Sequence, residues 1–166
     1  GTGSGELVTC DQTVESCQTA IVEFSYEGMD PIYNVFKNCS GVGAKNTLFR
    51  STVNEAFYQQ SVEVCQTNGC NKGPLQFPPK NTTLNGVKCP SCAVVGDLSC
   101  EATEVLGCVG EMTNCIYIVA TFRFSAAPPR QSAHRGCTSA KSEEQFPRGP
   151  ADTIQDIVTL IVSKGL

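Results

Sequence analysis

Short runs of alternating apolar and polar residues predict β-strands along much of this chain. The clearest run, residues 116–124, alternates and is rich in β-branched side chains, and residues 20–24 show the same pattern earlier in the chain. Residues 61–64 form a third short run that leads directly into Cys65. These runs favour small antiparallel sheets as the main secondary structure.

The C-terminal stretch is open to two interpretations. Asp152 could cap a helix with an apolar face made of Ile154, Ile157, Val158 and Ile161. All four of these side chains are β-branched, which favours a strand to a similar degree. No segment reaches the roughly 20 apolar residues that span a bilayer, and the C-terminal run is too short for a lipid-anchor signal.

The cysteine positions reveal an internal repeat. Two sets of three cysteines share intervals of 7 and 22 positions: Cys10, Cys17 and Cys39, then Cys108, Cys115 and Cys137. The second set is therefore the first one shifted by 98 positions (108 − 10 = 98). Flanking residues follow the same shift: Val8 maps to Leu106, Ile21 to Val119, Phe24 to Phe122, Pro31 to Pro129 and Ser40 to Thr138. We therefore predict two copies of one small domain.

The proline-rich segment 74–85 separates the two copies and is predicted to be a stiff linker. This places the first domain at residues 1–73 and the second at residues 86–166. When the 98-position shift is applied backwards, Cys89 and Cys92 fall before residue 1, and when it is applied forwards, Cys70 falls beyond residue 166. We therefore expect the first domain to be incomplete at its N-terminus and the second at its C-terminus.

Composition points to an extracellular protein. Eleven cysteines, 15 glycines, 9 prolines and no tryptophan describe a loop-rich chain with a thin apolar core that disulfides would stabilise. Such a dense cysteine framework predicts secretion, and Asn38 and Asn81 both begin N-glycosylation sequons. Residues 1–5 lack the features of a signal peptide, so we expect a mature form or a fragment. The net charge of −4 gives no basic stripe for nucleic acid.

The cysteine motifs resemble those of a known family. Residues 65–71, Cys-Gln-Thr-Asn-Gly-Cys-Asn, resemble the closing Cys-x4-Cys-Asn signature of the lymphocyte-antigen/urokinase-receptor family of three-finger (LU) domains. Residues 89–92, Cys-Pro-Ser-Cys, with the four cysteines that follow, are similar to the opening half of such a domain. The resemblance implies an all-β chain of two tandem, small, disulfide-rich, snake-toxin-like domains, both incomplete. The two-domain layout looks most like gamma-type phospholipase A2 inhibitors and amphibian sodefrin-precursor-like factors.

The resemblance also implies how the cysteines pair. Carried over position by position, the family pattern gives five disulfides: Cys10–Cys39, Cys65–Cys70, Cys89–Cys115, Cys92–Cys100 and Cys108–Cys137. Cys17 occupies the position of Cys115, whose partner Cys89 has its counterpart before residue 1. Cys17 is therefore expected to be unpaired.

The residues offer little for catalysis or metal binding. Cys89-x-x-Cys92 could be a redox dithiol or half of a zinc site, but no helix start follows it and no second ligand pair has matching spacing. His134, the one histidine, lies in a polar segment that we expect to be a solvated loop, and Glu143 and Glu144 are expected on a polar turn. We therefore expect no enzyme activity, no metal and no cofactor. Free thiols at Cys89 and Cys92 would favour the redox or metal alternative.

Two loops remain as candidate binding surfaces. One is acidic and aromatic and contains Tyr26, Met29, Tyr33 and Phe36, whereas the other is basic and contains Arg123, Phe124 and Arg130. The alternative is that the aromatic residues simply fill a thin core. The resemblance implies a phospholipase A2 inhibitor-like protein that contacts a secreted phospholipase A2 through its loops. A signalling or pheromone-like factor is the alternative, and a homo-oligomer is a further expectation.

Overall fold

The chain forms an all-β structure, described here from a computed structural model over residues 5–123, 128–147 and 153–166. The described residues form nine strands: β1 (Cys17–Tyr26), β2 (Ile32–Cys39), β3 (Thr47–Val53), β4 (Ala56–Cys65), β5 (Leu84–Val95), β6 (Glu104–Val109), β7 (Asn114–Phe122), β8 (Arg130–Thr138) and β9 (Ile154–Lys164). Two short 3-10 turns, η1 (Cys70–Lys72) and η2 (Glu143–Gln145), complete the described elements. Within the described residues, no helix is long and apolar enough to cross a membrane.

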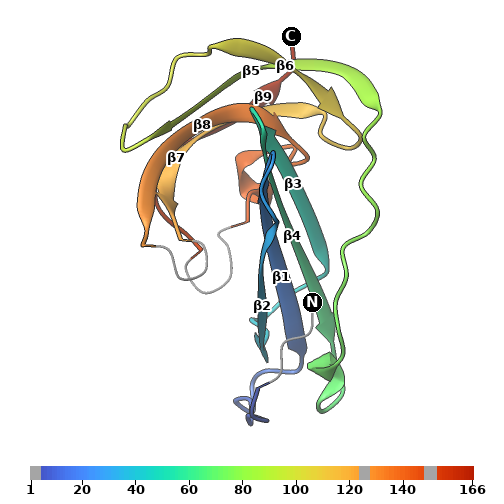
Figure 1. Ribbon diagram of the computed structural model, residues 1–166. Coiled ribbons are helices and arrows are strands. Elements are labelled where there is room, and N and C mark those ends of the chain that lie inside the picture. Colours follow the sequence, from blue (N-terminus) through green and yellow to red (C-terminus); the bar gives the residue numbers. More distant parts are fainter. Residues whose placement is uncertain (1–4, 124–127, 148–152) are drawn as a thin grey trace.

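All strand pairs are antiparallel, in the order β2-β1-β4-β3-β8-β5-β6, with β7 paired to both β8 and β9. Figure 1 shows β1–β4 as an elongated layer whose upper end meets the curved strands β5–β8. The strands predicted at 20–24 and 61–64 lie within β1 and β4. The strand predicted at 116–124 matches β7 as far as Phe122, and residue 124 lies outside the described residues. The predicted all-β, disulfide-rich fold is confirmed, and it is consistent with three-finger domains.

The internal repeat reappears in the strand register. Cys17 on β1 lies opposite Cys39 on β2 and opposite Cys65 on β4. Cys115 on β7 lies opposite Cys137 on β8 and opposite Ser163 on β9. Each of these positions differs from its counterpart by the same 98 residues. Strands β1, β2 and β4 therefore correspond to β7, β8 and β9, and we call the segments 5–73 and 84–166 the first and second halves.

Ten of the eleven cysteines are paired: Cys10–Cys39, Cys65–Cys70, Cys89–Cys115, Cys92–Cys100 and Cys108–Cys137. Cys17 is free and half-buried. The six cysteines of the second half are at most 6% exposed, whereas those of the first half are half-buried. The bridges therefore form part of the core in the second half, where Met112 shares a buried cluster with four of these cysteines: Cys89, Cys108, Cys115 and Cys137.

The C-terminal stretch is a strand, so the helix alternative is wrong. β9 pairs with β7 along nearly its whole length, and this pairing satisfies backbone groups that a helix would have satisfied internally. Ile154 is buried while Val158 and Ile161 are 59% and 49% exposed, so the proposed helix face does not exist. Asp156, with φ 47°, lies at the register shift between β9 and β7. Asp152, the predicted cap, lies outside the described residues.

The two halves share a core. Phe49 of β3 packs with Ile116 and Ile118 of β7, and its ring meets that of Phe146 edge to face with centroids 5.3 Å apart. The segment 74–85, predicted as a linker, runs upwards beside the first half to reach β5 (Figure 1). Leu75 within it is only 5% exposed, so this segment packs on the sheet.

Candidate functional site

The first predicted loop forms an exposed apolar tip. Tyr26, Met29 and Tyr33 are 45%, 66% and 52% exposed, and Ile32 beside them is 38% exposed. We call these four residues the β1–β2 tip. Phe36, also predicted as a contact residue, is half-buried in the middle of β2 opposite Ala20 and lies outside the tip.

Backbone geometry holds the β1–β2 tip in place. Gly28 takes the left-handed φ of 80° that the tight turn requires, and the Met29 amide donates to the Tyr26 carbonyl at 3.0 Å. The Glu27 amide donates to the carbonyl of Glu55 in the β3–β4 turn at 3.1 Å. The two neighbouring turns are therefore tied together, and the tip is presented on a fixed base.

The second predicted loop is placed only in part. Arg123 follows β7, is exposed, and its amide donates to the Thr153 carbonyl at 2.8 Å. Arg130 is the exposed first residue of β8 and lies opposite Phe122 on β7. Phe124 lies outside the described residues. The structure therefore gives two exposed cations at the ends of adjacent strands.

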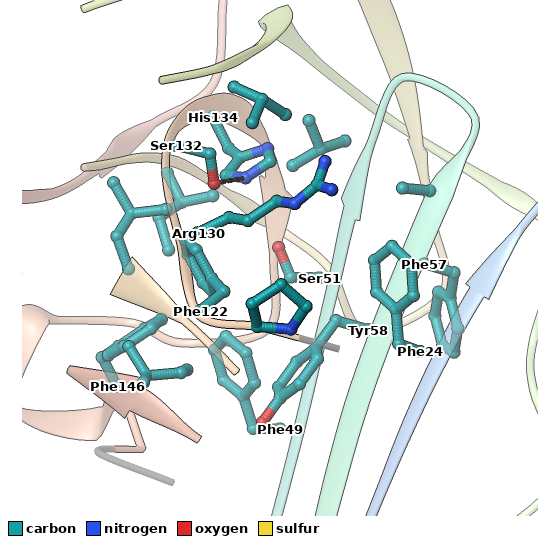
Figure 2. Close-up of a pocket in the computed structure, with 17 residues that line it drawn as sticks. Phe24, Phe49, Ser51, Phe57, Tyr58, Phe122, Arg130, Ser132, His134 and Phe146 are labelled. Carbon is teal, nitrogen blue, oxygen red and sulfur yellow. Dashed lines mark hydrogen bonds between the residues drawn. The ribbon is translucent and has the colours of Figure 1, made fainter. Parts of the chain in front are cut away.

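A cavity of about 350 Å³ lies between the two halves (Figure 2). Strands β3 and β4 line one side, β7 and β8 line another, and Arg130 is among the lining residues. Among the described residues of the wall, six are phenylalanine or tyrosine: Phe24, Phe49, Phe57, Tyr58, Phe122 and Phe146. Among the predicted binding residues that the structure describes, only Arg130 lines this cavity.

Four polar side chains of the cavity wall, those of Ser51, Tyr58, Ser132 and His134, have hydrogen-bond partners within the protein. Ser51 Oγ donates to the Cys137 carbonyl at 2.9 Å, and Tyr58 Oη donates to Gln60 Oε1 at 3.0 Å. Ser132 Oγ and His134 Nε2 share a hydrogen bond of 2.7 Å. Burial raises the pKa of the Tyr58 hydroxyl and lowers the pKa of His134 to about 4, so both side chains are neutral at pH 7.

The prediction that His134 lies in a solvated loop is wrong. His134 is a residue of β8, paired with Ile118 on β7 and Ala93 on β5. Its ring meets Phe122 edge to face with centroids 5.2 Å apart. A strand paired on both sides can bury a polar side chain when that side chain has a hydrogen-bond partner, which Ser132 supplies here.

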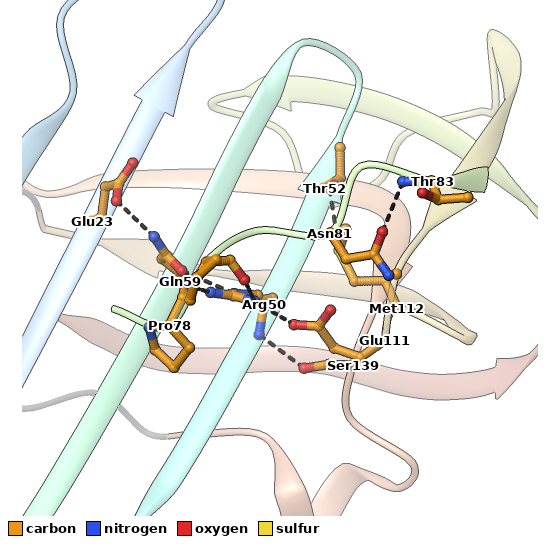
Figure 3. Close-up of polar contacts among 12 residues, drawn as sticks. Glu23, Arg50, Thr52, Gln59, Pro78, Asn81, Thr83, Glu111, Met112 and Ser139 are labelled. Carbon is orange, nitrogen blue, oxygen red and sulfur yellow. Dashed lines mark hydrogen bonds and ion pairs between the residues drawn. The ribbon is translucent and has the colours of Figure 1, made fainter. Parts of the chain in front are cut away.

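A buried polar network centred on Arg50 joins the halves (Figure 3). Arg50 Nε donates to Gln59 Oε1 at 2.9 Å, and its Nη1 lies 2.7 Å from Glu111 Oε1 in the second half. Other guanidinium hydrogens reach the carbonyls of Pro78 and Pro79. These contacts use four of the five guanidinium N–H groups, so Arg50 has a structural role.

Three cysteine sulfurs come close enough to suggest a metal site. The Sγ atoms of Cys89, Cys108 and Cys137 lie within 4.8 Å of one another and are buried. Each sulfur already belongs to a disulfide and therefore offers no thiolate. The cluster is a packing contact between two bridges.

Both sequon asparagines are exposed. Asn38 lies on β2, at the edge of the sheet, and Asn81 lies in the segment before β5. Asn81 Oδ1 accepts a hydrogen bond from the Thr83 amide at 3.0 Å. Exposure is the structural condition for a glycan at either position.

No known protein-family profile matches this chain. Among solved structures, the chain is similar to mouse TEX101, with a TM-score of 0.39 and 17% sequence identity. The similarity covers 98% of this chain and 88% of that one.

Proposed function

We propose that this chain is a secreted, non-enzymatic LU-type protein that binds another protein through the β1–β2 tip. It would consist of two domains, residues 1–73 and 86–166, joined by the segment 74–85. The repeated cysteine pattern and the five disulfides support this proposal, because a sheet cross-linked by disulfides can hold its loops in place without a large apolar core. Glycans on Asn38 and Asn81 would fit the same setting.

The single observation that carries the binding role is the exposure of the β1–β2 tip. Four neighbouring large side chains, two of them tyrosines, face solvent on a fixed turn. Tyrosine is enriched among residues that dominate binding energy at interfaces, because it buries a large rigid surface at low entropic cost. Exposed Glu27 and Asp30 flank the tip, so its partner should present an apolar pocket with cations at the rim.

The partner that we propose is a secreted phospholipase A2, which the tip would block by surface contact. This choice rests on the resemblance of the cysteine pattern to gamma-type inhibitors. Inhibition should then be stoichiometric and should require no turnover by this protein.

The test is to titrate the refolded, disulfide-bonded protein into secreted phospholipase A2 and to follow hydrolysis. We expect inhibition at or below micromolar concentration, and a loss of about tenfold or more in the double variant Tyr26→Ser/Tyr33→Ser. Leu98→Ser is the matched control, because Leu98 is 57% exposed but lies in the second half. No inhibition at micromolar concentration would overturn the inhibitor role, and equal effects of both variants would overturn the role of the tip.

A further inference from the structure

We propose that the cavity between the two halves binds a small amphiphilic anion, with an apolar body of about fatty-acid size against the aromatic walls and one negative head group at Arg130. This site is separate from the β1–β2 tip, so the inference does not rest on the proposed function. Its support comes from the size of the cavity, the chemistry of its walls and the position of its one charge.

The walls suit an apolar body. The cavity volume of about 350 Å³ falls at the lower end of the roughly 300–1,000 Å³ typical of small-molecule sites. Aromatic residues from β1, β3, β4 and β7 line it together with Ile116, Ile118 and Ile154. An apolar molecule placed there would exchange contact with water for contact with these side chains, which is favourable in proportion to the area buried.

The wall offers few hydrogen bonds to a polar body. The hydroxyl hydrogens of Ser51 and Tyr58 are already donated within the protein. Ser132 and His134 bond to each other. A sugar or a peptide backbone would lose its bonds to water on entry without full replacement, and that loss disfavours polar ligands.

The head group should be negative because of Arg130. Among the described lining residues Arg130 is the one full charge, and no carboxylate accompanies it. The ion pairs found among the described residues join Arg50 to Glu111 and Lys80 to Glu23, and they do not involve Arg130. In Figure 2 the Arg130 side chain extends across the cavity. The His134–Ser132 pair lies on one side of it, and the rings of Phe122 and Tyr58 lie on the other. A guanidinium in this position can donate two parallel bonds to a carboxylate.

The experiment measures displacement of 1-anilinonaphthalene-8-sulfonate, a fluorescent probe with aromatic rings and one sulfonate, from the intact disulfide-bonded protein. The competitors share a ten-carbon chain and differ in head group: decanoate, decanol and decyltrimethylammonium, all below micelle-forming concentration. We expect decanoate to compete best and the cation worst, by roughly tenfold or more. Equal competition by all three, or no probe binding, would overturn the proposal.

Two kinds of variant locate the site. Arg130→Gln should weaken decanoate roughly tenfold and leave decanol unchanged, because it removes only the charge that pairs with the head group. Lys141→Gln is the matched control, since Lys141 is exposed and lies outside the cavity wall. If Lys141→Gln weakens decanoate as much as Arg130→Gln does, the anion binds by general charge attraction and the proposal fails.

Filling the cavity should abolish binding of decanoate and decanol alike. Ala56→Leu adds bulk to the wall, and Val53→Phe does so from the neighbouring strand, which provides a second test if one variant does not fold. Near-ultraviolet circular dichroism confirms folding before binding is measured. Full binding by a folded cavity-filled variant would place the ligand elsewhere and overturn the assignment.

Discussion

His134 makes the stability of this protein depend on pH. Burial lowers the pKa of His134 from its ordinary 6.5 to about 4, so the folded chain stays neutral there while the unfolded chain takes up a proton. Acid therefore favours the unfolded state between these two values. We predict that protonation of His134 in the unfolded chain lowers the free energy of unfolding by on the order of 3 kcal/mol between pH 7 and pH 4.

Urea denaturation at several pH values between 7 and 4 measures this effect. Because carboxylates also titrate in the lower part of this range, the informative quantity is the difference between the wild type and His134→Gln. The variant cannot take up a proton at this position, so its stability should fall less steeply as the pH drops. Parallel curves for the two proteins would contradict the prediction.

Cys17 provides a second prediction at the residue scale. It is the one unpaired cysteine, is half-buried, and lies on β1 between Cys39 and Cys65. We predict that mild oxidation gives a covalent dimer of the wild type and none of Cys17→Ser, as seen on a non-reducing gel. The variant should retain wild-type stability within about 0.5 kcal/mol, as is usual outside the core. A dimer that persists in Cys17→Ser would show that another bridge opens.

At the scale of elements, the contact between β3 and β8 depends on Gly136. A Cβ atom built on Gly136 would lie 2.0 Å from the carbonyl oxygen of Thr52. Gly136→Ala must therefore push β3 away from β8 and disturb the pairing of Thr52 with Cys137. We predict a loss of about 2–4 kcal/mol in the free energy of unfolding, in line with other strongly disruptive substitutions.

The matched control for this prediction is Gly41→Ala. A Cβ atom at Gly41 meets nothing within 4 Å, so its effect should stay within about 0.5 kcal/mol. Urea denaturation of both variants under the same conditions gives the comparison. If Gly136→Ala is as stable as Gly41→Ala, the close approach of the two strands is not required for stability.

The strands differ in how well the sequence predicts them. β1 and β7 are central strands that contain the alternating, β-branched runs at 20–24 and 116–122, so their pattern is clear from the sequence. The sequence of β9 is ambiguous because the spacing of its apolar residues fits both the helical period and the strand period. Its pairing with β7 makes it a strand. β8 is missed because it has polar residues such as Ser132 and His134 facing the cavity, and their hydrogen bond is visible only in three dimensions.

At the scale of the whole molecule, cysteine spacing predicts more than apolar pattern does. The 98-position shift anticipates which strands correspond, because equivalent cysteines occupy equivalent register positions. The cavity could not be predicted in this way, since its lining residues lie between positions 24 and 154 and come from both halves. The contacts between the two halves occur once in the molecule, so the internal repeat of the sequence cannot predict them.

Arg50 is the clearest of these unrepeated contacts. Its guanidinium is held by Gln59 in the first half and by Glu111 in the second, and its backbone exchanges hydrogen bonds with Ser139. We predict that Arg50→Met lowers the free energy of unfolding by about 2–4 kcal/mol, because buried acceptors lose their donor. Arg50→Lys should restore only part of this loss, since an ammonium cannot make the same set of contacts.

Hydrogen exchange distinguishes a local effect from a global one. Because Arg50 bonds to both halves, Arg50→Met should reduce amide protection in β1 and β4 and also in β7 and β8. Arg123→Met is the matched control, since Arg123 is exposed and should change protection little. A loss of protection confined to β1–β4 would mean that the second half is stable without this network. The coupling of the two halves would then rest on their other contacts, such as the shared core around Phe49 and the pairing of β3 with β8.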